Sequence, residues 1–100
     1  MSSNTYQSEK EDEEGLNKVF DGCDSVFSGQ VRAIDLIDSM KQQWLNASAD
    51  HCSERERKIC LNDLKRRLDP RGDNGYLERA YFIKCGLEWI KKIRVIIFLK

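Results

Sequence analysis

The single histidine of the chain, His51, stands directly before Cys52, and a histidine with a cysteine is the pair from which a nucleophilic site can be built. Such a site needs the imidazole in contact with the thiol, whereas adjacent residues in a linker usually point apart. No partner that would serve as an acid or stabilise an oxyanion is evident beside the pair. We therefore expect that the protein is not an enzyme.

The four cysteines, Cys23, Cys52, Cys60 and Cys85, lack the C-x-x-C spacing of a zinc ribbon or a thioredoxin-like redox site. We expect reduced thiols that pack in a core. Residues 1–14 are polar and acidic and contain no apolar stretch of the kind that a secretory signal needs. These two features favour a reducing compartment and a cytoplasmic location.

Oxygen-bearing side chains gather in the segment that begins at Asp24. If Asp24 is the first position of a twelve-residue calcium loop, Ser28 is the fifth position and Asp35 the twelfth. Gly29 then falls at the sixth position, where such a loop bends, and Val31 at the eighth, where a short strand pairs with a second loop. The spacing thus matches the scaffold of a calcium loop.

The ligand chemistry of this loop is poor, because calcium takes six to eight oxygens. Val26 occupies the third position, and Arg32 brings a positive charge to the ninth. Asp35 is one methylene shorter than the glutamate that usually supplies two oxygens at the twelfth position. We therefore expect no metal or other cofactor, with calcium held weakly through Asp24, Ser28 and Asp35 as the alternative.

A second loop is predicted over residues 69–75, because Pro70 disfavours helical geometry before it and two glycines permit tight turns. If Gly75 is placed at the bend and Leu77 at the strand position, Pro70 becomes the first residue and Tyr81 the twelfth. Neither of these supplies a carboxylate. We expect this loop to bind no ion.

Apolar residues at helical spacing predict the elements that carry the two loops. The stripe of a first helix, which ends near Asp24, consists of Leu16, Val19, Phe20 and Cys23. The face of a second helix, from about residue 32 to 45, consists of Ala33, Ile37, Met40 and Trp44, with Leu36 beside them. Both faces should pack on one core.

Two more helices are predicted in the second half. Ser53 and Glu56 form a capping box ahead of a third helix, whose stripe consists of Cys60, Leu61, Leu64 and Leu68. A fourth helix begins after Leu77 and carries Phe82, Cys85, Trp89 and Ile93, with Ile83, Leu87 and Ile90 broadening its apolar surface. Gly86 inside it should weaken the helix or admit a close neighbour.

Length and composition limit the alternatives. A chain of 100 residues supports one core, and 40% hydrophobic residues exclude a disordered tail. The 17 basic and 17 acidic residues balance, so we expect no nucleic acid as partner. No apolar run has the roughly 20 residues of a membrane span, so we expect no membrane insertion. Residues 94–100 are mostly apolar and are compatible with a helix end, a strand or the junction to a longer protein.

The order helix, loop, helix, linker, helix, loop, helix predicts an all-α fold, a degenerate EF-hand pair with a small two-stranded pairing between the loops. We predict a disordered acidic leader over residues 1–12 and the paired unit over residues 13–93. The first hand spans residues 14–45 and the second 53–92, with a linker over 46–52. Residues 94–100 form a tail.

A narrower resemblance covers residues 16–92. The sequence resembles the divergent EF-hand pair at the head of KASH-domain dynein adaptors of the meiotic nuclear envelope, and related pairs in coiled-coil adaptors. The residues that carry the resemblance are Phe20-Asp21-Gly22-Cys23-Asp24, Ser28-Gly29-Gln30-Val31, Leu36-Ile37-Asp38-Ser39-Met40, Leu64, Leu68-Asp69-Pro70, Leu77, Phe82 and Trp89-Ile90. The long coiled coil and membrane anchor of that family are absent from these 100 residues.

The resemblance implies a calcium-independent groove that receives an amphipathic helix of the dynein light intermediate chain. It also implies a place at the cytosolic face of the nuclear envelope if the chain belongs to a longer protein. The residues expected to line the groove are Val19, Phe20, Leu36, Ile37, Met40 and Trp44. Two alternatives remain, a calcium sensor or buffer and a structural domain that associates with itself.

Overall fold

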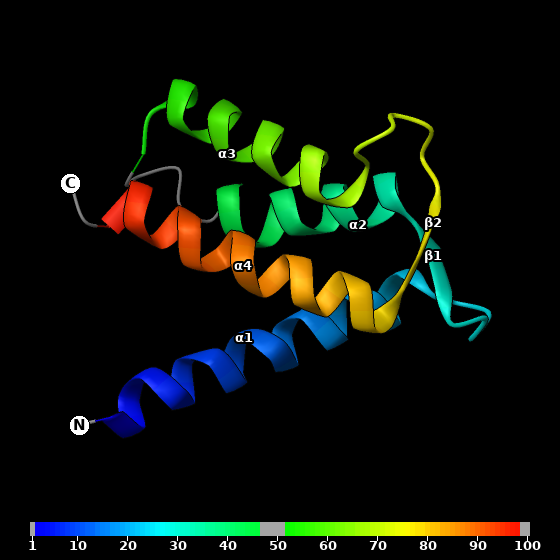
Figure 1. Cartoon of the computed structure of the whole chain (residues 1–100), viewed down its shortest axis with the longest axis horizontal. Coiled ribbons are helices and arrows are strands. Elements are labelled where there is room, and N and C mark those ends of the chain that lie inside the picture. Colours follow the sequence, from blue (N-terminus) through cyan, green and yellow to red (C-terminus); the bar gives the residue numbers. More distant parts are fainter. Residues whose placement is uncertain (1, 47–51, 99–100) are drawn as a thin grey trace.

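The computed structural model describes residues 2–46 and 52–98, and the side chains of residues 9–46 and 52–96. Helices dominate the described part, as expected for an all-α fold (Figure 1). The elements in chain order are α1 (Ser2–Cys23), β1 (Gln30–Arg32), α2 (Ala33–Met40), the π-helical turn η1 (Lys41–Asn46), α3 (Glu54–Leu68), β2 (Tyr76–Glu78) and α4 (Arg79–Phe98).

The two strands join two helix–strand–helix halves at one end of the molecule, on the right of Figure 1. They run antiparallel, and Val31 lies opposite Leu77 in the centre of the pairing. Val31 is buried and Leu77 is half-buried against the core. The predicted pairing of the two loops through these residues is confirmed.

One apolar core lies between the helices. The Phe20 and Phe82 rings pack at a centroid distance of 6.0 Å, which joins α1 to α4. The buried apolar residues are Leu16, Val19, Phe20, Val31, Ala33, Leu36, Ile37, Met40, Leu45, Cys52, Cys60, Leu64, Leu68, Phe82, Trp89, Ile90 and Ile93. They include most of the residues that the four predicted stripes placed inside.

At Gly86, α4 lies close against Leu16 of α1. A methyl group built on Gly86 would stand 2.8 and 2.9 Å from the two Cδ atoms of Leu16. Leu16 is fully buried there. The prediction that this glycine admits a close neighbour is confirmed, since any larger side chain would displace Leu16.

The capping box of α3 is present as predicted. The backbone N–H of Glu56 donates to Ser53 Oγ at 3.2 Å, and the backbone N–H of Ser53 donates to Glu56 Oε1 at 2.9 Å. These bonds satisfy amides at the start of the helix that have no partner within it. The local sequence therefore fixes where α3 begins.

The second helix departs from its prediction at its end. A regular helix would turn Trp44 into the core four residues after Met40, but η1 is a π-helical turn in which residues five apart align. Leu45 is consequently buried at 1% exposure, whereas Trp44 is half-buried. Trp44 rests edge-on against Trp89, with a centroid distance of 6.5 Å, and beside Gly15 of α1.

Residues 2–12, which the sequence predicts to be a disordered leader, belong to α1, which begins at Ser2. Ion pairs to α4 hold this helix at Glu9 and Asp12. The Arg94 guanidinium donates to both carboxylate oxygens of Asp12 at 2.6 and 2.7 Å, and Lys91 Nζ lies 3.8 Å from Glu9 Oε2. Sequence periodicity misses these contacts because it reads only apolar residues.

Two other predicted segments are the tail over residues 94–100 and the linker over residues 46–52. Helix α4 continues to Phe98, so the tail predicted over residues 94–100 is a helix end as far as that residue. Residues 47–51, which make up most of the predicted linker and include His51, lie outside the described residues.

The four cysteines all lie in the described part of the chain and form no disulfide there. Cys52 and Cys60 are buried, and Cys23 and Cys85 are half-buried against the core. Burial is the main cause that raises the pKa of the Cys60 thiol, with the neighbouring Cys52 adding to it. Cys60 is thus a protonated core residue with little nucleophilic character.

Candidate partner-binding surface

The six residues predicted to line a partner groove belong to the core or its edge. Exposure is 3% or less for all except the half-buried Trp44, and the set is Val19, Phe20, Leu36, Ile37, Met40 and Trp44. Helix α4 covers two of them, with Phe82 against Phe20 and Trp89 against Trp44. In this conformation the buried members of the set form no open groove.

The three candidate calcium ligands of the first loop line one hollow of about 380 Å³, together with Arg32 and Tyr76. Asp24 is buried at 5% exposure, and its carboxylate is occupied by the loop itself. Its Oδ1 accepts hydrogen bonds from the Ser28 backbone at 2.9 Å and the Ser28 hydroxyl at 3.0 Å. Its Oδ2 accepts one from the Gly29 backbone at 2.8 Å.

These bonds determine the charge state of Asp24. Burial alone would raise the pKa of its carboxyl, but the hydrogen bonds from Gly29 and Ser28 outweigh burial and lower the pKa, with a smaller contribution from Arg79. Asp24 thus closes the loop as an ionised acceptor. Among the described residues, no group of three or more histidine, cysteine or acidic side chains is arranged to hold a metal ion.

The second loop is closed in a similar way and also reaches across to the first half. The Asn74 backbone donates to both carboxylate oxygens of Asp69 at 3.1 and 3.2 Å. The Asn74 side chain then accepts from the Ile34 backbone at 2.8 Å, and the Gly75 carbonyl accepts from the Ala33 backbone at 3.0 Å. Loop 69–75 therefore caps the start of α2, whose own N-cap residue provides no side-chain bond.

A separate groove runs along the outside of the molecule between α1 and α4, and we call it the α1–α4 groove. Its volume is about 680 Å³, and Ala80, Ile83 and Leu87 of α4 form its apolar floor. Ile83 and Leu87 are half-buried, and they pack on the core with one side. The other residues that line the groove are Glu13, Asn17, Arg79 and Lys84.

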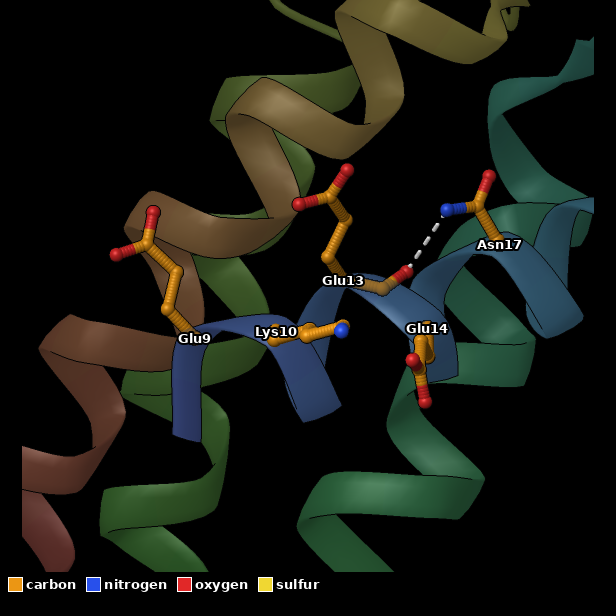
Figure 2. Close-up of a pocket in the computed structure, with 5 residues that line it drawn as sticks. All are labelled: Glu9, Lys10, Glu13, Glu14 and Asn17. Atoms are coloured by element: carbon orange, nitrogen blue, oxygen red, sulfur yellow. Dashed lines mark hydrogen bonds between the residues drawn. The ribbon is translucent and has the colours of Figure 1, made fainter. Parts of the chain in front are cut away.

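The two walls of the groove carry opposite charges. On the α1 wall, Glu13 is exposed, and a shallow hollow of about 430 Å³ along α1 shares Glu13 and Asn17 with the groove. Figure 2 shows Glu9 and Glu13 projecting from one side of α1, whereas Glu14 projects from another. On the α4 wall stands the exposed Lys84. Glu13 and Lys84 form no ion pair within the described side chains.

Arginines of α4 tie this helix to α1 beside the groove and farther along α4. Near the sheet, Arg79 pairs with Asp21 and donates to Asn17 Oδ1 at 3.0 Å, and its guanidinium lies 4.7 Å from the centre of the Phe20 ring. Toward the other end of α4, Arg94 holds Asp12 with two hydrogen bonds. Arg79 thus lines one end of the groove, whereas the Arg94 bridge lies beyond the residues that line it.

Sequence reasoning identified Ile83 and Leu87 as additional apolar surface but assigned them no role. The signal that would have found the groove is the spacing of Ala80, Ile83 and Leu87 at i, i+3 and i+7, a second stripe beside the one that faces the core. The acidic wall falls in or next to the segment that was predicted to be a disordered leader.

Comparisons with protein-family models, with curated proteins and with solved structures found no match to this chain. Among the described residues, no helix has the length and apolar character that crossing a membrane requires.

Proposed function

We propose that the chain is a protein-interaction module that binds an amphipathic helix of a partner protein, on a scaffold of two EF-hand-like halves that assembles without calcium. The observation that carries the proposal is the α1–α4 groove, which has an apolar floor and charged walls and stays open while the core is closed. Apolar anchors at helical spacing in a groove are the usual basis of helix recognition.

The scaffold part of the proposal rests on how the two loops are closed. Each loop uses one aspartate, Asp24 or Asp69, to accept backbone N–H groups, and the strands that follow pair at Val31 and Leu77. Internal hydrogen bonds therefore do in this chain what an ion does in a calcium loop. The loops need no cation to hold their shape.

The nature of the partner follows from the resemblance to dynein adaptors. On that basis, the first partner to test is the amphipathic helix of the dynein light intermediate chain. We propose no catalytic role. The only histidine lies outside the described residues, and the buried thiol of Cys60 has a raised pKa.

Calorimetric titration tests the proposal. We expect no saturable heat with calcium and saturable binding of a peptide that carries the dynein light intermediate chain helix, with the same affinity in chelator and in calcium. Binding of the peptide only when calcium is present would contradict the calcium-independent scaffold. Absence of binding in both conditions would contradict the named partner.

A calcium sensor or buffer is the second candidate, because Asp24, Ser28 and Asp35 do line one hollow. In that case calcium would have to replace the hydrogen bonds from Ser28 and Gly29 to Asp24. A saturable calcium titration that is lost in Asp24→Asn and Asp35→Asn would establish this function instead.

A further inference from the structure

We infer that a partner helix lies in the α1–α4 groove with cationic side chains on the flank that faces α1 and a carboxylate on the flank that faces Lys84. This inference rests on the proposed helix-binding function and adds to it the site and the charge pattern of the partner.

The floor of the groove has the geometry that a helix needs. Ala80, Ile83 and Leu87 follow one another at i, i+3 and i+7, so they form a straight row along α4. A helix that packs along this row needs its own apolar residues at the same period. The row is accessible in the closed conformation, whereas residues such as Phe20 and Met40 are fully buried.

The length of the groove sets the length of the occupant. The residues of α4 that line the groove run from Arg79 to Leu87, a distance of about 12 Å along the helix at 1.5 Å per residue. A partner helix makes contact with this part of α4 over about two turns. This length suits a short linear segment better than a folded domain with a broad, flat face.

The charges on the walls of the groove determine which charges the partner helix carries on its two flanks. On the α1 wall, the exposed Glu13 supplies the negative charge. The opposite wall presents Lys84. Rim charges steer encounter and fix orientation, so the complementary helix carries Lys or Arg toward α1 and Asp or Glu toward Lys84.

Three designed peptides of roughly 18 residues, long enough to be helical, serve as probes. All share the same leucine row. The first has lysines on one flank and glutamates on the other, the second has lysines on both flanks, and the third has glutamates on both. Each is titrated by fluorescence anisotropy against the full chain at low and high salt.

We expect the wild-type chain to prefer the peptide with mixed flanks, by about threefold to tenfold. Lys84→Glu should shift the preference to the all-lysine peptide, and Glu13→Lys to the all-glutamate peptide. Both changes are at exposed side chains, so the fold is preserved. Ile83→Ser should weaken all binding by tenfold or more. The matched control is Ile59→Ser, since Ile59 lies on α3 with 50% exposure and should leave binding unchanged.

The outcomes distinguish an error in the inferred binding site from an error in the proposed helix-binding function. If a peptide or the natural helix binds but Ile83→Ser, Lys84→Glu and Glu13→Lys change nothing, the site is wrong and the helix-binding function stands. If neither the designed peptides nor the natural helix bind, both proposals fail. If sedimentation shows a dimer that Ile83→Ser dissociates, a second copy of the chain fills the groove and the inferred partner is overturned.

Discussion

Helix α4 packs against α3 on one side and against α1 on the other, and it holds these two neighbours by different means. On the α3 side, the indole N–H of Trp89 donates to the Cys60 carbonyl at 2.8 Å within the core. Asp63 of α3 then accepts from Lys92 at 3.1 Å, which extends the contact to the surface. Apolar packing, a buried hydrogen bond and an ion pair thus act together along this interface.

On the α1 side, the means of contact change along the helix. The second half of α1 packs through Leu16 and Phe20 and is also bridged by Arg79, whereas Glu9 and Asp12 contact α4 through ion pairs. Because partly exposed ion pairs stabilise less than fully buried apolar contacts, residues 9–12 are more easily displaced than the second half of α1. The proposed binding groove lies on this less secured side.

The largest expected effect is at the contact of Leu16 with Gly86. Leu16→Ala removes a fully buried side chain and should lower the free energy of unfolding by about 2–5 kcal/mol in urea denaturation. Gly86→Ala alone should lower it by about 1–3 kcal/mol, because the new methyl group meets the Leu16 side chain.

The double variant sharpens this prediction. In the Leu16→Ala background, Gly86→Ala meets no leucine and should stabilise by about 1 kcal/mol, since alanine favours the helix over glycine. If the two single effects simply add, Leu16 and Gly86 are not coupled and the described approach of α1 to α4 is incorrect.

The next prediction tests the contact between α3 and α4. Trp89→Phe keeps an aromatic ring but removes the donor to Cys60, and we expect a loss of about 1–2 kcal/mol in the same denaturation experiment. The change Trp44→Phe is the control, because Trp44 is only half-buried and its replacement leaves the Trp89 bond in place. An equal loss in both variants would argue against a specific role for that bond.

A smaller effect is expected at the charged half of α1. Arg94→Gln removes both bonds to Asp12 and should cost about 0.5–1 kcal/mol. Hydrogen exchange should rise in residues 9–15 and stay unchanged in residues 16–23, which packing holds. Lys58→Gln, at the exposed pair with Glu54, is the control and should have no such local effect. Uniform exchange along α1 would show that its two halves are held alike.

The smallest expected effect is the pH dependence of the stability that Asp63 of α3 contributes. Burial would raise the pKa of Asp63, but hydrogen bonds and charge from Arg67 and Lys92 outweigh burial and lower it. Because the folded-state pKa is the lower one, the stabilisation is complete above the unfolded pKa of about 4 and is lost as the pH falls toward the folded value. Asp63→Asn should therefore be less stable than wild type at pH 6, and the difference should narrow on acidification. A constant difference would contradict the ion-pair explanation.

The sequence predicted the helical stripes well, because the core residues recur at the period of a helix. The capping box at Ser53 and the pairing of Val31 with Leu77 were also readable, since each depends on local chemistry at fixed spacing. The error at Trp44 has a different origin. A π-helical turn shifts the inward position by one residue to Leu45, and no residue in the stripe signals that shift.

The candidate site was harder to predict. Apolar residues on α2 and α1 were assigned to a groove, but whether such a face is exposed or covered depends on how α4 packs, which one sequence does not reveal. The contacts that Glu9 and Asp12 of α1 make with Lys91 and Arg94 were not predicted, because each joins residues more than 80 positions apart. Long-range ion pairs leave no periodic pattern in the chain.

The cap that Asn74 provides for α2 has a consequence for biosynthesis. The residue that satisfies the Ile34 backbone lies 40 positions downstream, so α2 is synthesised before the residue that caps it. During that interval the first half lacks both the Asn74 bond and the strand partner of Val31. The halves therefore mature together, and the first acquires its final form only after the second has been synthesised.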